Sequence, residues 1–179
     1  MPPFEIKEVH ISELKELLQF ARDCFVDTYA SQNTAENMSL YLKEEFSEEK
    51  ILELLNEPNV KFFFALNGGE IIGYLQINWG KAQSENLDSS VEIARIYVRK
   101  DFQGRKTGSL LLKQALQFGK ELGAKWLWLG VWEKNTKAMD FYQKNGFQIF
   151  DQHIFKLGSD EQLDWMMRIK IEQDRDEIS

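Results

Sequence analysis

The chain has 179 residues, of which 43% are hydrophobic and 13% aromatic, enough to form the core of one compact domain. It carries 22 Lys and Arg residues against 29 Asp and Glu residues, so its formal charge is −7. This acidic balance argues against nucleic-acid binding, which needs a basic surface. It suits a cationic partner, or simply a soluble surface.

The sequence gives no sign of export, membrane insertion or metal binding. The first residues, "MPPFEIKEVHISEL", lack the apolar core of a signal peptide, and no apolar run approaches the roughly 20 residues of a membrane span. Cys24 is the single cysteine and cannot form an internal disulfide, which fits a reducing cytosol. With only His10 and His153 besides, a zinc site is not expected. We expect a cytoplasmic protein, monomeric or homodimeric, with one domain over residues 1–179.

The first half of the chain predicts a strand, three helices and a hairpin. The segments, in order, are "EIKEVH", "ISELKELLQFARDCFVDTYA", "TAENMSLYLKEEF", "SEEKILELLNEP" and "NVKFFFALNGGEIIGYLQINW". Ser12 is the expected N-cap of the first helix, and Pro58 stops the third. In the hairpin, Asn67-Gly68-Gly69 separates two apolar runs.

The second half alternates strands and helices. After the loop "AQSENLDSS", we expect a strand "VEIARIYVRK", a helix over about 107–122, a strand "AKWLWLGVW" and a helix over about 136–144. Two strands, "FQIFDQHIFKL" and "DWMMRIKI", follow, and 172–179 is expected to be a frayed tail. Hairpins followed by a β-α-β crossover predict an α/β fold with a mixed, mainly antiparallel sheet. The crossover requires "RIYV" and "WLWLGV" to be parallel neighbours or near-neighbours.

The turn "QGRKTGS", Gln103 to Ser109, lies between the predicted strand and helix. A helix N-terminus offers unpaired N–H groups and the positive end of its dipole, and glycines let the backbone approach a ligand closely. The turn therefore suits a pyrophosphate, although neither G-x-x-x-x-G-K-[ST] nor G-x-G-x-x-G occurs there. A plain connection between strand and helix is the alternative interpretation.

A second motif follows about thirty residues later. The stretch "LWLGVWEKNTKAMDFYQKNGF" ends in N-x-x-A-x-x-F-Y-x-x-x-G-F. Together with "IYV…QGRKTG", it resembles the GNAT superfamily of acetyl-CoA-dependent N-acetyltransferases, whose turn reads [QR]-x-x-G-x-[GA]. Over residues 5–171, the chain is similar to the bacterial spermidine/spermine N-acetyltransferases of the PaiA type. One departure is Lys106, which stands where the family pattern has Gly and puts the loop geometry in question.

The resemblance implies a fold with helices on both faces of the sheet, and an acetyl-CoA site. The backbone of the strand would pair with the pantetheine arm, the turn would hold the pyrophosphate, and two residues of the next helix would add contacts. The residues implied are Ile96, Tyr97, Val98, Gln103, Gly104, Arg105, Lys106, Thr107, Gly108, Ser109, Asn135 and Lys144. Asn135 is also the expected helix N-cap, and Lys144 also fits a solvated helix face.

The reaction that the resemblance implies is direct attack of an amine on the acetyl thioester. At pH 7 only roughly one alkyl amine in a thousand is neutral, so a base must remove a proton. In the family a glutamate can occupy the position of Glu92, and Tyr142 would lie near the thioester sulfur. By strand alternation, Glu92, Ala94, Ile96 and Val98 should share one face. Glu92 could equally be an inert strand-end residue, and Tyr142 a packing residue.

The acceptor site is less determined. In the family it is bordered by the first two helices and by the loop after the hairpin. Here these carry Asp27, Tyr29, Glu36, Tyr41, Glu44, Glu45, Trp79 and Glu85, and we take Asp27, Tyr29, Glu36, Tyr41 and Glu85 as substrate candidates. Carboxylates and aromatic faces suit a polyamine cation. His153 matches a histidine of the polyamine acetyltransferases, and we favour a structural role for it.

We therefore expect an N-acetyltransferase that moves acetyl from acetyl-CoA to a primary amine of spermidine or spermine. One alternative keeps the chemistry but changes the acceptor to an aminoglycoside, an amino acid or a protein amine. Another is an acyl-CoA sensor without turnover, which an intact Glu92 and Tyr142 speak against. The expected partners are acetyl-CoA and a small cationic amine, with no nucleic acid and no membrane.

Overall fold

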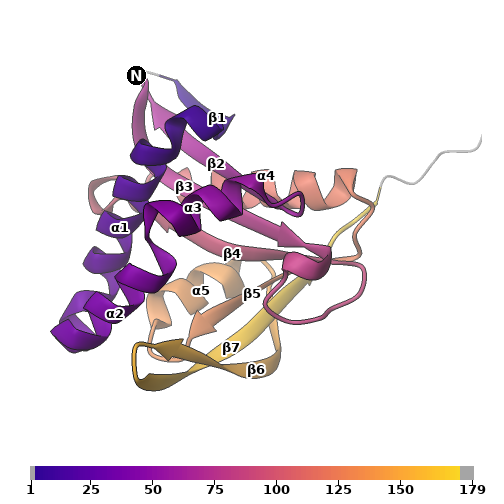
Figure 1. Ribbon diagram of the computed structural model, residues 1–179. Helices are drawn as coiled ribbons and strands as arrows, with labels where there is room; N and C mark the ends of the chain where they lie inside the picture. Colours follow the sequence, from indigo (N-terminus) through magenta and orange to yellow (C-terminus); the bar gives the residue numbers. More distant parts are fainter. Residues whose placement is uncertain (1–2, 174–179) are drawn as a thin grey trace, which may run out of the picture.

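A computed structural model describes residues 3–173 and places seven strands in one sheet, in the order β1-β2-β3-β4-β5-β7-β6. Figure 1 shows the sheet with its helices. The strands are β1 (Phe4–Glu8), β2 (Val60–Asn67), β3 (Glu70–Trp79), β4 (Ser90–Val98), β5 (Trp126–Trp132), β6 (Gln148–Leu157) and β7 (Asp160–Lys170). Only the β4–β5 pair is parallel among these. The predicted mixed sheet with one parallel crossover is confirmed.

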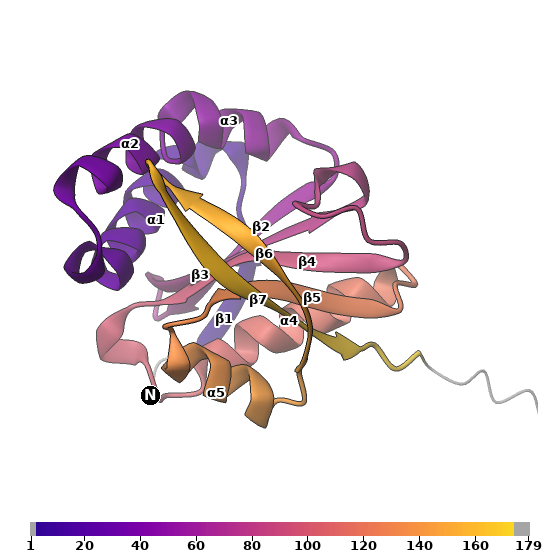
Figure 2. The same ribbon diagram turned by 90° about the horizontal axis from the view of Figure 1, so that it is seen from below.

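Five α-helices cover the two faces of the sheet. They are α1 (Leu14–Tyr29), α2 (Ala35–Glu45), α3 (Glu48–Asn56), α4 (Thr107–Glu121) and α5 (Thr136–Lys144). Helices α1, α2 and α3 lie on one side of the sheet, and α4 and α5 lie on the other (Figure 2). The expectation of helices on both faces is therefore confirmed.

Two apolar cores follow from the alternation of side chains along the strands. In β2, Phe62 and Phe64 pack under α1–α3, whereas Phe63 and Ala65 pack under α4. Burial of each such phenylalanine stabilises the fold by about 1.5–3 kcal/mol. A strand that is apolar on both faces is therefore held between two helical layers, as the run "KFFFAL" requires.

The helix ends are set by local chemistry that the sequence largely predicts. Gly123 and Gly146 follow α4 and α5 with positive φ angles of 69° and 90°, as glycines after helix C-termini commonly do. The predicted N-cap at Ser12 is wrong. His10 caps instead: its Nδ1 accepts from the Ser12 N–H, and its own N–H donates to Glu13 Oε2 at 2.8 Å. Glu13 stands three residues after His10, so the capping box begins there and a short 3₁₀ turn precedes α1.

The last described residue contacts the connection between α4 and β5. In the expected tail 172–179, Gln173 is described, and its Nε2 donates to the Ala124 carbonyl at 2.8 Å. The rest of that segment, 174–179, lies outside the described residues.

A bulge in β4 changes which of its residues share a face. Gln76 pairs with Arg95 but the next residue of β3, Ile77, pairs with Ile93, so Ala94 is an extra residue. The predicted face shared by Glu92, Ala94, Ile96 and Val98 is therefore wrong. Glu92 lies on the same face as Arg95, under α1–α3, because their partners on β3, Asn78 and Gln76, are hydrogen-bonded neighbours.

Candidate active site

Strands β4 and β5 pair over only four residues and then separate. The last parallel pair is Ile93 with Leu129, although β4 runs on to Val98 and β5 to Trp132. The unpaired parts of both strands line a cavity of about 1080 Å³. The two strands are parallel neighbours, as expected, but the paired residues of β4 are 90–93, and "RIYV" itself makes no pair with β5. Beyond Ile93, the edge of β4 is open to a ligand.

The turn before α4 lies at one end of this cavity. Gln103, Gly104, Lys106, Gly108 and Ser109 line it. Lys106 adopts a left-handed conformation with φ 69° at the N-cap of α4, so the lysine takes up a turn that favours glycine. The first N–H groups of the helix are left for a ligand, and Lys100 and Lys137 bring further positive charge to the same cavity.

Gln103 fastens the turn to its neighbours. Its Nε2 donates to the Val98 carbonyl at 3.1 Å, and its Oε1 accepts from Lys137 Nζ at 2.7 Å. The turn is therefore tied both to the end of β4 and to α5. This fixes the helix N-terminus relative to the open strand edge.

Helix α5 brings Tyr142 to the cavity from the α4 side of the sheet. Asn135 Oδ1 caps the helix by accepting from the Ala138 N–H at 3.2 Å, as the sequence predicts. Tyr142 lines the cavity and is 7% exposed, and burial raises the pKa of its phenol. A raised pKa keeps the phenol protonated at neutral pH, so Tyr142 is a hydrogen-bond donor there.

Glu92 lies beside the point where β4 and β5 separate and is 5% exposed. Burial raises the pKa of its carboxyl group. Ser84 opposes that effect by donating two hydrogen bonds: its N–H to Oε2 at 2.8 Å and its Oγ to Oε1 at 2.5 Å. A buried carboxyl with a raised pKa at a cavity wall is what a general base requires.

His153 lies near Glu92 between two carboxylates. Its Nδ1 is 3.1 Å from Glu85 Oε1, and its Nε2 is 3.4 Å from Asp164 Oδ2. The hydrogen bond with Asp164 is the largest cause that raises the pKa of His153. Asp164 is 8% exposed, and its Oδ1 has no hydrogen-bond partner in the described chain.

Asp164 was not among the site residues predicted from the sequence. The signal that could have found it is the hairpin register, which pairs Asp164 with His153 on the next strand. A β6–β7 turn at Gly158-Ser159 fixes that register.

The helices α1 and α2 contribute part of the predicted acceptor wall. Asp27, Tyr29, Tyr41 and Glu45 line the cavity, as does Glu85 from the loop. The Tyr29 ring packs on Trp132 with centroids 5.9 Å apart, so aromatic faces from α1 and β5 meet there.

Other predicted residues lie away from the cavity lining. Glu36 and Glu44 are exposed on α2, and Trp79 packs on Phe118 in the α4 core. Among the predicted cofactor residues, Lys144 and Arg105 are exposed outside the lining, and Thr107 is buried beneath it.

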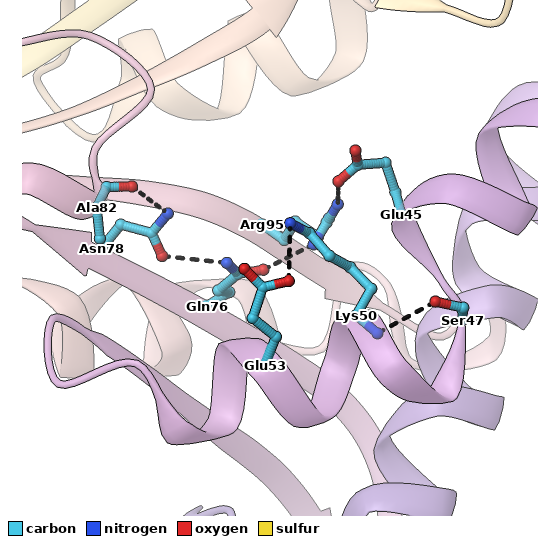
Figure 3. Close-up of polar contacts among 8 residues, drawn as sticks. All are labelled: Glu45, Ser47, Lys50, Glu53, Gln76, Asn78, Ala82 and Arg95. Atoms are coloured by element: carbon cyan, nitrogen blue, oxygen red, sulfur yellow. Dashed lines mark hydrogen bonds and ion pairs between the residues drawn. The ribbon is translucent and has the colours of Figure 1, made fainter.

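Arg95 is a second residue that sequence analysis missed. Its side chain, drawn in Figure 3, is 13% exposed and is one of the residues that line the cavity. Nη1 donates to Gln76 Oε1 at 2.8 Å, and Nη2 lies 3.7 Å from Glu45 Oε2. Gln76 in turn donates to Asn78, which donates to the Ala82 carbonyl. This chain of oriented amides holds the guanidinium in place, and the Ala94 bulge brings it to the acceptor side of the sheet.

Residues 3–173 contain neither a cluster of metal ligands nor a membrane-spanning helix. No group of three or more His, Cys, Asp or Glu residues there is placed to hold a metal ion. No helix in that range is long and apolar enough to cross a membrane.

Comparison with known proteins finds the same fold and one family. The model of the acetyltransferase (GNAT) family matches residues 14–147. An uncharacterized N-acetyltransferase of Lactobacillus delbrueckii subsp. lactis is 38% identical over 170 residues, which cover 91% of this chain and 96% of the relative. A spermidine N(1)-acetyltransferase of Thermoplasma acidophilum is 27% identical over 151 residues, 82% of this chain and 89% of the relative.

One solved structure extends the comparison to three dimensions. The crystal structure of a PaiA N-acetyltransferase from Thermoplasma acidophilum, in complex with coenzyme A, matches with a TM-score of 0.77 and 26% identity. The match covers 94% of this chain and 99% of the other.

Proposed function

The chain belongs to the acetyltransferase (GNAT) family, and we propose that it transfers acetyl from acetyl-CoA to a primary amine of a small polyamine such as spermidine or spermine. The observation that carries the polyamine assignment is the composition of the acceptor end of the cavity. Its lining combines aromatic side chains with four carboxylates, those of Asp27, Glu45, Glu85 and Asp164. Carboxylates attract ammonium groups, and aromatic faces bind cations. The likeness to a spermidine N(1)-acetyltransferase supports the same acceptor.

The co-substrate would lie along the open edge of β4. There the backbone of Ile96, Tyr97 and Val98 would pair with the pantetheine arm in the manner of an added strand. The turn Gln103 to Ser109 would receive the pyrophosphate at the α4 N-terminus. The likeness to an acetyltransferase solved with coenzyme A supports this arrangement.

The chemistry would be direct attack by the neutral amine on the thioester carbonyl. Glu92 takes a proton from the amine, the nitrogen forms a bond to the acetyl carbon, and the carbon–sulfur bond then breaks. Tyr142 donates its phenolic proton to the departing thiolate and regains a proton from solvent. The nitrogen loses its second proton to solvent, and Glu92 releases the proton it took, so one proton is set free for each amide formed. The base, Glu92, would reach the reacting atoms from the α1–α3 side of the sheet, and the acid, Tyr142, from the α4–α5 side.

The test is the release of free CoA with a panel of amines. Spermidine and spermine should have a higher kcat/KM than a monoamine of similar length and basicity. Added salt should reduce this preference, because it screens partly exposed charge pairs. Equal turnover of both amine classes at every ionic strength would overturn the polyamine assignment. It would leave acetyl transfer itself intact.

Arg95 favours a second candidate, an amine that carries a carboxylate, such as an amino acid. A guanidinium pairs well with a carboxylate, and its nearest anionic partner, Glu45, is 3.7 Å away and 38% exposed. Comparison of an amino acid with the amine that lacks only its carboxylate separates the two candidates. A higher kcat/KM for the amino acid, lost in Arg95→Gln, would identify this acceptor class.

A further inference from the structure

Glu92 does not face the acceptor region alone, because Ser84 donates a hydrogen bond to each of its carboxylate oxygens. The Ser84 N–H and hydroxyl donate to Oε2 and Oε1 respectively. Both residues line the cavity, but Glu92 is buried whereas Ser84 is exposed. The serine hydroxyl is thus the accessible member of the pair. Among the described residues it makes no other hydrogen bond, so its oxygen can still accept one.

The loop that carries Ser84 is fixed on both sides of the cavity. Gln83 Oε1 accepts from Trp128 Nε1 of β5 at 2.7 Å, and Gln83 Nε2 donates to the Gly80 and Leu87 carbonyls. One residue earlier, the Ala82 carbonyl accepts from Asn78 of β3. Ser84 is therefore held in place relative to both strands that flank Glu92. Such positioning before the substrate binds is what a proton-transfer group needs.

We propose that the Ser84 hydroxyl relays the proton from the acceptor amine to Glu92. The ammonium donates to Ser84 Oγ and passes its proton there, while the proton already on Oγ moves to Glu92 Oε1. The amine is left neutral with a free electron pair, the serine regains its hydroxyl, and Glu92 becomes a neutral acid. This inference rests on the proposed function, because it takes Glu92 as the base.

The pH dependence of Ser84→Ala separates a relay from a merely structural contact. The charged groups that face Glu92 are His153 of β6 and Glu85 of the loop, with Arg95 three residues on along β4. The Ser84 hydroxyl lowers the pKa of Glu92, so its loss shifts the acidic limb of kcat/KM to higher pH. If the contact is only structural, kcat/KM of Ser84→Ala should reach the wild-type plateau at pH values above the shifted acidic limb. If Ser84 is a relay, the plateau value of kcat/KM should itself be lower than in the wild type.

The experiment measures kcat and kcat/KM against pH for Ser84→Ala, Ser84→Thr and Ser84→Val, with thermal unfolding and CoA binding as checks. We expect Ser84→Ala and Ser84→Val to lose roughly 10²-fold or more of kcat/KM at the pH plateau, since a positioned proton-transfer group contributes about 10²–10⁴-fold. Thr has nearly the shape of Val but keeps the hydroxyl, so it should recover most of the rate. The matched control is Ser90→Ala, because the Ser90 hydroxyl bonds only to the Asp88 carbonyl and Ser90 lies outside the cavity lining.

Two results would overturn the relay: a plateau at the wild-type value in Ser84→Ala or Ser84→Val, or Thr no more active than Val. Glu92→Gln then separates the relay from the proposed function. If Glu92→Gln is inactive while Ser84→Ala is fully active, Glu92 takes the proton directly. If Glu92→Gln is itself fully active, the base assignment fails, and the relay fails with it.

Discussion

Asp164 Oδ2 lies 3.4 Å from His153 Nε2, and the two residues are directly paired on neighbouring strands. Glu85 approaches the other ring nitrogen of His153 from a loop. The two carboxylates differ in exposure, 11% for the Asp164 side chain and 41% for that of Glu85. An ion pair that is shielded from water is screened less. Asp164 should therefore raise the pKa of His153 more than Glu85 does.

We expect the pKa of His153, measured by NMR titration, to lie above its ordinary value of 6.5. Asp164→Asn should lower it more than Glu85→Gln does, because the bond with Asp164 is the larger cause of the shift. The two variants are matched in chemistry, since each replaces a carboxylate with an amide. A larger effect from Glu85→Gln would contradict this order.

The same shift makes stability depend on pH. Because the pKa of His153 is raised on folding, its stabilising contribution is fully present below pH 6.5 and is lost as pH rises through the folded value. The free energy of unfolding of the wild type, relative to His153→Gln, should therefore fall between pH 6 and the folded pKa. Urea titrations at a series of pH values measure it. A difference that grows with pH would mean that burial, not the carboxylates, controls His153.

Replacement of Tyr142 by Phe should reduce kcat by roughly 10²-fold, the effect of losing a general acid. The ring stays, and with it the packing on Phe141 and Phe147, so thermal stability and acetyl-CoA affinity should change little. Steady-state kinetics and thermal unfolding on the same samples measure these effects. Phe147→Leu is the packing control, expected to lose stability rather than turnover, because Phe147 packs on Tyr142 but lies outside the cavity lining. Near-normal kcat in Tyr142→Phe would make Tyr142 a packing residue.

Lys106→Gly should raise stability slightly. A left-handed lysine costs about 1–2 kcal/mol, while glycine costs about 0.5–1 kcal/mol in unfolded-chain entropy, so a gain of up to about 1.5 kcal/mol is expected. CoA affinity should stay equal or become tighter, because the turn keeps its shape. Calorimetric titration with CoA measures it. A large loss of affinity would instead identify the lysine ammonium as a ligand of the phosphates.

Cys24 should not react with thiol reagents at pH 8 in the folded protein. Burial raises the pKa of its thiol to about 12, and the side chain packs in the α1 core. Denaturation in urea should expose the thiol and allow full labelling. The extent of labelling is measured by absorbance. Rapid labelling of the native protein would show that α1 opens locally.

The sequence predicted the fold well because its elements are marked locally. The helix periodicity, the Asn67-Gly68-Gly69 turn and the glycines after α4 and α5 each depend on a few neighbouring residues. The turn Gln103 to Ser109 and the motif around Tyr142 could be located for the same reason. Their roles rest on the family resemblance and stay predictions.

The features that could not be predicted from the sequence depend on the register between strands. The extra residue at Ala94 is visible only in the pairing of β4 with β3, and strict alternation without it predicts that Glu92 and Ile96 share a face. Asp164 and Ser84 come next to functional residues only through the folded sheet and loop. A lone serine in a polar loop carries no signal of the carboxyl group it will contact.

The separation of β4 from β5 has a consequence for backbone dynamics. Beyond Ile93, the amide groups of β4 that point away from β3 have no partner on β5, so their hydrogens should exchange with solvent far sooner than those of the paired segment. A ligand laid along that edge would complete the ladder. Slowed deuterium uptake over residues 94–98 on addition of CoA, with no change over 90–93, would then locate the bound arm without a crystal.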